Sequence, residues 1–199
     1  MAEPRKVAGM ITATSRTAYH EAGHAVVAVV LRRAITHVSI VPTDECLGHV
    51  QHPTGVADPD RRTIENLKEQ SLADSMAAAA AYLERLDGGW MTEARYGLRR
   101  SRARDDIAIR LAGPRAEKRF SGRWDNRGAR HDREHALDLA DRLANDSSVT
   151  SKGILVHEDA RADRILKENW PSVVAVADAL LVKSHLTGRE VRAIVKATK

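Results

Sequence analysis

One short stretch constrains the fold and the chemistry of this chain more than any other. Within residues 18–31 the sequence reads His20-Glu21-Ala22-Gly23-His24, which is the H-E-x-x-H spacing. On an α-helix, residues four apart lie one turn apart on the same face, so the imidazoles of His20 and His24 can converge on one metal ion. Zinc accepts neutral imidazole nitrogens, and Glu21 can take a proton from a water molecule that the metal activates. The spacing therefore predicts a helical zinc site.

The residues after this motif indicate that one side of the helix is buried. Val27 and Leu31 continue the face that carries the histidines, and further valines at positions 26, 29 and 30 widen it. A buried polar side chain needs a partner, so a metal site is a better interpretation than a surface helix with two histidines by chance. Gly23 costs about 1 kcal/mol relative to Ala in a helix. We therefore expect close packing or substrate approach at Gly23.

Several longer segments carry a resemblance to a known family. The motif lies in AYHEAGHAVVAVVL and is followed, in order, by ITHVSIVP, LGHVQHP, RLAGPRAEKRFSG, GARHDREHALDLADRL and ILKENW…LLVKSHLTGREVRAIV. Together these segments resemble the peptidase domain of FtsH-type ATP-dependent zinc metalloproteases. The resemblance implies a mainly α-helical zinc-peptidase domain with a small β-hairpin beside the metal-binding helix. The transmembrane anchor and the AAA-type ATPase module of that family have no counterpart in the sequence, so we expect a stand-alone domain.

The resemblance also sets the expected domain organisation. Residues 1–13 show no clear periodicity and are predicted to be a flexible N-terminus. Residues 14–199 are expected to form a single FtsH-like peptidase domain. The segment at about 59–104 is longer than the matching family segment, so we interpret it as an insertion.

The third metal ligand depends on the resemblance. The family supplies an aspartate at the start of a later helix, and Asp132 stands at the matching position. From the residues alone, His131 and His135 form a second histidine pair at helical spacing. Either histidine is an acceptable alternative ligand, or it could form a hydrogen bond with a ligand and orient it. We favour Asp132 and leave the histidines as alternatives.

The predicted secondary structure follows from periodicity and from turn residues. We expect the metal helix to be capped by Thr14 or Ser15 and to run to about Arg33. An internal proline, Pro114, makes the geometry of one helix uncertain, and Thr187 with Glu190 forms a capping box for the last helix. The expected strands cover residues 35–41 and 47–51, which can pair and offer a peptide an edge. The other expected helices cover residues 59–86, 105–120, 129–144, 159–170 and 172–185, with a loop over residues 147–155.

Composition narrows the class and the compartment. Hydrophobic residues make up 43% of the 199 residues, which indicates a globular protein, and aromatic residues make up only 4%, which suits helices packed through Ala, Val, Leu and Ile. The single cysteine, Cys46, excludes an intramolecular disulfide and is compatible with a reducing compartment. No apolar run approaches the ~20 residues that span a bilayer, and no signal region opens the chain. We therefore expect a soluble cytoplasmic protein.

Positive charge is concentrated in the expected insertion. The net charge is +5, and five arginines fall within ten residues: Arg95, Arg99, Arg100, Arg102 and Arg104. Such a cluster can contact phosphate or acidic protein surfaces, but a charge run is more often a solvated face. No nucleic-acid motif accompanies it, so we do not expect nucleic acid as a partner. Of all segments of the chain, this one is the best candidate for contact with a regulatory protein partner.

These observations predict a zinc-dependent endopeptidase. His20, His24 and Asp132 would bind Zn²⁺, and Glu21 would act as general base on the attacking water. The chain has no G-x-x-x-x-G-K-[ST] phosphate loop, so the substrate should be an unfolded or flexible protein segment, or a protein delivered by a separate ATPase. The resemblance also implies a homo-oligomer. The alternatives are a narrow protease that cuts one partner and a non-catalytic zinc-binding regulatory or adaptor module.

Overall fold

The computed structural model describes residues 12–42, 48–51, 93–125, 129–145 and 149–198. The chain divides into two compact units, one formed by residues 1–52 and 104–199 and the other by residues 53–103. Of the second unit, only residues 93–103 are described, as the start of a helix. The helix expected over residues 59–86 lies outside the described residues. The insertion at about 59–104 stays a prediction.

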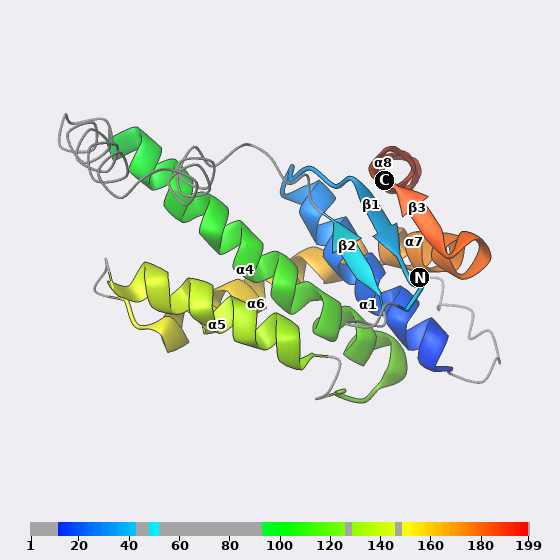
Figure 1. The fold of residues 1–199 in the computed structure, drawn as a ribbon, viewed down its shortest axis with the longest axis horizontal. Helices are drawn as coiled ribbons and strands as arrows, with labels where there is room; N and C mark the ends of the chain where they lie inside the picture. The colour runs from blue at the N-terminus through cyan, green and yellow to red at the C-terminus, as the bar shows by residue number, and fades with distance from the viewer. Residues whose placement is uncertain (1–11, 43–47, 52–92, 126–128, 146–148, 199) are drawn as a thin grey trace, which may run out of the picture. The chain divides into compact units, whose positions relative to one another are not determined.

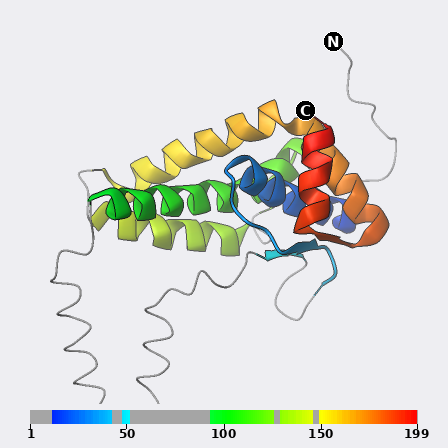
Figure 2. The ribbon, with the colours of Figure 1, turned by 90° about the horizontal axis from the view of Figure 1, so that it is seen from above.

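The described elements confirm a mainly α-helical fold with a small antiparallel sheet (Figure 1). In chain order they are α1 (Ala13–Val30), β1 (His37–Ser39), β2 (His49–Gln51), α4 (Glu93–Ser121), α5 (Arg130–Asn145), α6 (Ser151–Glu168), α7 (Trp170–Lys183), β3 (His185–Thr187) and α8 (Gly188–Ala197). Within the unit of residues 1–52 and 104–199, α1 contacts α6, α7, α8 and strands β1 and β2. The C-terminal part of α4 runs beside α5 and α6 (Figure 2). None of the described helices is long and apolar enough to cross a bilayer.

Helix α1 is the most deeply buried part of this unit. Its residues from Ala18 to Ala28 are all buried, including the whole H-E-x-x-H motif. The helix begins two or three residues earlier than expected, because Thr12 forms a capping box with Ser15. It ends at Val30, and Arg32 adopts a left-handed backbone with φ of 57°. The predicted cap at Thr14 or Ser15 and the predicted end at Arg33 are therefore wrong by two or three residues.

The core around α1 is built mainly from small and aliphatic side chains, as the composition predicts. Three aromatic residues form one cluster at the edge of this core. The Tyr19 ring stacks on Phe120 of α4 with centroids 3.8 Å apart, and it lies 5.9 Å from the ring of Trp170. This cluster joins α1 to the end of α4 and the start of α7, which fixes the helix that carries the motif.

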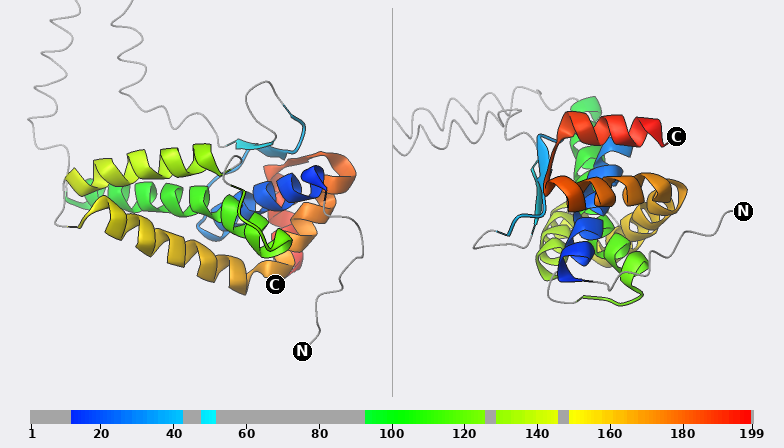
Figure 3. Two further views of the ribbon diagram at one scale, coloured as in Figure 1. Left: turned by 90° about the horizontal axis from the view of Figure 1, so that it is seen from below. Right: turned by 90° about the vertical axis from the view of Figure 1, so that its right-hand side faces the viewer.

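The sheet contains the predicted hairpin and one strand that the sequence did not reveal. Strands β1 and β2 pair antiparallel with Val38 opposite Val50, as expected. The third strand, β3, pairs with the other side of β1, with Leu186 opposite Val38, so the strand order is β2-β1-β3 (Figure 1). Figure 3 gives two further views of the same unit. The sequence predicts a helix end at His185 and a helix cap at Thr187, and no strand between them. Strand β1 is thus the central strand, and β2 and β3 are the two edge strands. Of these edge strands, β2 is the one that packs against α1.

Two further helix boundaries differ from the predictions. Helix α4 already begins by Glu93, before the predicted start at Asp105, and it continues through Pro114 as the predicted helix over residues 105–120 does, because tertiary packing outweighs the lost hydrogen bond. Helix α6 begins at Ser151, where Thr150 accepts a hydrogen bond from the backbone N–H of Gly153. The predicted loop over residues 147–155 therefore ends at Thr150. The capping box of Thr187 and Glu190 at the start of α8 is confirmed.

Candidate metal centre

Two residues of α1 and one residue of α5 bring their possible ligand atoms together. His20 Nε2 lies 3.0 Å from Asp132 Oδ2 and 3.0 Å from His24 Nε2, and His24 Nε2 lies 3.2 Å from the same carboxylate oxygen. All three residues are buried. A tetrahedral zinc ion with ligands at about 2.0–2.2 Å holds the ligand atoms roughly 3.3–3.6 Å apart, so the trio fits zinc in composition, and its spacing is only a few tenths of an ångström shorter. Across the described ranges, this is the group of His, Cys, Asp and Glu that meets the requirements of a metal ion.

The second ring nitrogen of each histidine has its own acceptor. His20 Nδ1 donates to Glu117 Oε2 at 3.2 Å, and His24 Nδ1 donates to the backbone carbonyl of Ile109 at 2.7 Å. Glu117 is itself buried and accepts from Arg16 Nε at 2.8 Å. When Nδ1 carries the hydrogen, the lone pair of a neutral imidazole lies on Nε2, which is the atom that faces the trio. Glu117 and Ile109 therefore orient both imidazoles so that Nε2 faces the trio.

Sequence reasoning missed Glu117, although one signal was available. Glu117 adjoins the apolar face of α4 that carries Ala112 and Ala116, and a carboxylate beside such a face needs a buried partner. The partner, His20, lies 97 residues earlier in the chain. Only the fold brings the two together.

A glycine on α4 lets this helix approach the histidines. A methyl group at Gly113 would overlap the His24 imidazole and would come within 2.8 Å of His20 Nε2. The same two helices also meet closely at Gly23 of α1, where a methyl group would lie 2.8 Å from the carbonyl oxygen of Ala112 on α4. The close packing expected at Gly23 is therefore confirmed. Gly113 is a site residue that the sequence did not single out.

Arg110 holds the outer oxygen of Asp132. Its Nη1 donates to Asp132 Oδ1 at 3.4 Å, while Oδ2 faces the two histidines. The Arg110 side chain is 41% exposed, in contrast to the 9% of Asp132. The guanidinium thus contacts the trio from its more open side and leaves one carboxylate oxygen for a metal. This contact was also not foreseen from the sequence.

The electrostatics of the trio favour a positive charge at its centre. Burial opposes the charged form of His20, but hydrogen bonds with Asp132 and Glu117 and the nearby charge of Glu21 raise the pKa of His20 to about 10. Burial also opposes the ionised form of Asp132, yet His24 and His20 hold the pKa of that carboxyl well below its usual range. In the metal-free protein a proton supplies the positive charge. A divalent cation can supply it in the same place.

Glu21 lies at the edge of this arrangement. It is buried, and its charge acts on the pKa of His20, so it is close to the trio. A methyl group at Gly48 would come within 2.9 Å of both Cγ and Oε1 of Glu21. Gly48 directly precedes strand β2, so the edge strand begins next to the Glu21 carboxylate. The glycine leaves room for that carboxylate.

The structure separates Asp132 from the histidines that were its alternatives. Asp132 lies on the buried face of α5, whereas His131 and His135 are exposed. Their two rings pack edge to face, with centroids 4.6 Å apart. Neither of them belongs to the trio. The geometry therefore brings together the residues favoured from the sequence and leaves the alternatives at the surface.

Comparisons with known proteins agree with the chemistry of this trio. No family model matches the chain. Over 186 residues it is 29% identical to the "ATP-dependent zinc metalloprotease FtsH" of Acidimicrobium ferrooxidans, and over 189 residues it is 26% identical to the protein of the same name from Caldicellulosiruptor bescii. The chain is similar to part of FtsH. Each match covers 90% of this chain but only 27% and 29% of the two FtsH relatives, respectively.

Proposed function

We propose that this protein is a zinc-dependent endopeptidase in which His20, His24 and Asp132 bind the metal and Glu21 is the general base. The observation that carries the proposal is the convergence of three buried ligand atoms from two helices, within 4.8 Å of one another, with a buried glutamate beside them. The distant similarity to FtsH zinc metalloproteases supports the same chemistry. A zinc ion is the cofactor that this donor set suits best.

In the proposed mechanism, the metal, the general base and the residues that orient the histidines have separate roles. Zinc, when bound, supplies Lewis-acid activation of water and of the peptide carbonyl. Glu21 accepts a proton from the attacking water and then donates it to the nitrogen of the leaving amine, so the carboxylate is regenerated. Glu117 and the Ile109 carbonyl keep both imidazoles in the required tautomer and orientation.

The proposed substrate is an unfolded or flexible protein segment. Strand β2 begins at the residue after Gly48, which contacts Glu21, and in the described part of the chain its only strand partner is β1. An extended peptide that pairs with the outer edge of β2 would pass next to the general base. A peptide in this position must already be unfolded. We therefore include delivery by a separate ATPase in the proposal.

The decisive experiment compares the wild-type protein with Glu21→Gln. We expect the zinc-loaded wild type to hydrolyse an unfolded substrate such as casein, and we expect the variant to lose at least about 100-fold in rate while it keeps one zinc ion per chain. Equal hydrolysis by both proteins would contradict the role of Glu21. Zinc binding without hydrolysis in either protein would favour the alternative, a non-catalytic zinc-binding module.

A further inference from the structure

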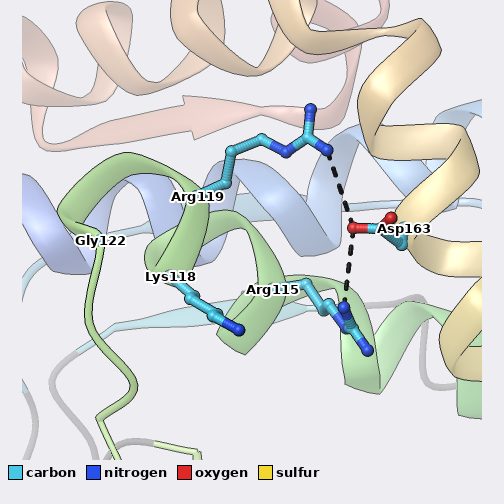
Figure 4. Close-up of a pocket in the computed structure, with 5 residues that line it drawn as sticks. All are labelled: Arg115, Lys118, Arg119, Gly122 and Asp163. Carbon is cyan, nitrogen blue, oxygen red and sulfur yellow. Dashed lines mark ion pairs between the residues drawn. The ribbon is translucent and has the colours of Figure 1, made fainter.

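A small cationic pocket lies on α4 away from the metal centre. It is lined by Arg115, Lys118, Arg119 and Gly122 of α4 and by Asp163 of α6, and its volume is about 220 Å³ (Figure 4). The four α4 residues are spaced i, i+3, i+4 and i+7, so they share one face of the helix. Glu117, two residues from Arg115, lies about 200° around the helix and points to His20. The pocket and the trio therefore use opposite faces of α4.

Two guanidiniums of the pocket converge on one acidic oxygen without binding it tightly. Arg115 Nη1 and Arg119 Nη2 lie 3.7 Å and 3.8 Å from Asp163 Oδ1, as the dashed lines in Figure 4 show. Both distances are ion-pair distances but exceed hydrogen-bond length. Arg115 is fixed from its other side by a two-pronged interaction with Asp159. The pocket thus places arginine donors around an anion position that Asp163 fills only loosely.

Lys118 adds a third positive charge to the pocket. Among the described residues, no carboxylate forms an ion pair with Lys118; its ammonium instead lies 4.4 Å from the centroid of the Trp124 ring. Gly122, with φ of 74°, ends α4 and turns the chain so that Trp124 returns to this face. Trp124 is 40% exposed, and Arg115 also lies over its ring, at 5.7 Å. The indole holds the cations beside the pocket and leaves their donors open to a ligand.

We propose that this pocket binds a phosphate group, either as free phosphate or as the phosphate of a phosphorylated serine or threonine side chain. A phosphate carries nearly two negative charges and several acceptor oxygens, so one group can accept from Arg115, Lys118 and Arg119 together. A single carboxylate, represented by Asp163, reaches two of these residues and hydrogen-bonds neither. The volume lies below the roughly 300–1,000 Å³ of pockets for larger ligands, which favours a compact group.

The proposal can be tested by titrating the whole 199-residue chain, freed of unbound zinc, with inorganic phosphate. The readout is the indole N–H resonance of Trp124, identified by its loss in Trp124→Phe. We expect a saturable shift, and we expect affinity to fall about tenfold in Lys118→Gln and in Arg119→Gln. The matched control is Lys152→Gln, which removes the same charge from an exposed position on α6 and should leave affinity unchanged.

Two further titrations distinguish a phosphorylated protein from free phosphate as the ligand, and specific phosphate binding from non-specific anion binding. A peptide that carries phosphoserine should bind more tightly than inorganic phosphate if the ligand is a phosphorylated protein, and equally or more weakly if it is free phosphate. Sodium acetate at the same ionic strength should produce no saturable shift. An equal response to acetate and phosphate would overturn the proposal. Undiminished phosphate binding by both pocket variants, with folding verified by circular dichroism, would also overturn it.

Discussion

Charged residues on the two faces of α4 differ in how deeply they are buried and how closely they are paired. On the face toward α1, Glu117 is buried and paired on both sides, by His20 and by Arg16, and Gly113 is in tight contact with the histidines. On the other face, Arg119 and Lys118 are held at ion-pair or cation–π distance and remain partly open to solvent. A fully paired buried network tolerates little change, whereas a loosely paired surface can exchange one partner for another. Substitutions on the two faces should therefore differ sharply in effect.

The largest effect is expected for Gly113→Ala. The added methyl group would overlap the His24 imidazole and approach His20, so both ligands must move or α4 must withdraw from α1. We expect zinc affinity to fall by at least about 100-fold, which is the upper end of the range for disturbed supporting groups. Isothermal titration calorimetry measures this affinity. The control is Gly97→Ala on the same helix, where an added methyl group meets no atom within 4 Å; equal affinities for the two variants would contradict the tight contact.

A smaller effect is expected for Glu117→Gln. The amide keeps the size of the side chain but removes the charge that His20 and Arg16 share. We expect zinc affinity to fall about 10–100-fold. The matched control is Glu134→Gln, which removes an exposed carboxylate that pairs with Arg130 on α5. If both substitutions left zinc affinity unchanged, Glu117 would not support the metal centre.

Gly48→Ala should separate proton transfer from metal binding. The methyl group would press on the Glu21 carboxylate but would touch neither histidine among its nearest contacts. We expect kcat/KM on an unfolded substrate to fall about tenfold, which is less than the loss of a general base itself. Zinc content, measured by atomic emission, should stay at one ion per chain. A loss of zinc together with activity would show instead that β2 supports the ligands.

The metal-free protein should lose stability as the pH rises. The folded pKa of His20 is about 10, compared with 6.5 as its ordinary value, so its contribution is fully present below pH 6.5 and is lost as the pH rises through about 10. Calorimetry with a chelator should show a Tm several degrees lower at pH 9 than at pH 6.5, since 1 kcal/mol shifts Tm by about 2–4 °C at this size. In the zinc-loaded protein this fall of Tm with pH should disappear, because the metal replaces the proton on His20. A metal-free His20→Ala variant that shows the same slope would rule out His20 as the cause.

The features that could be predicted from the sequence are those formed by residues close together in the chain. The spacing of His20 and His24, the apolar stripe of α1 and the capping box at Thr187 are all encoded within a few residues. Strand β3 is only three residues long and exists because Leu186 pairs with Val38, so no local period revealed it. Within the site, Asp132 was favoured through a resemblance, since the sequence alone could not say which residues of its helix face inward.

The supporting residues of the site escaped prediction for a related reason. Glu117, Gly113 and Arg110 lie on α4, far along the chain from the histidines, and their roles depend on how closely α4 packs on α1 and α5. The proline at position 114 also left the geometry of this helix undetermined by the sequence. Packing against two neighbours keeps the helix continuous, and the same packing positions these three residues.

The most direct test of the metal centre is the zinc affinity of Asp132→Asn compared with that of His135→Gln. Both substitutions alter the same helix, but Asp132 is buried in the trio, whereas His135 is exposed and outside it. We expect one zinc ion per chain in the wild type, a loss of at least about 100-fold in affinity for Asp132→Asn, and unchanged affinity for His135→Gln. Wild-type affinity in Asp132→Asn, or a loss confined to His135→Gln, would contradict the proposed ligand set.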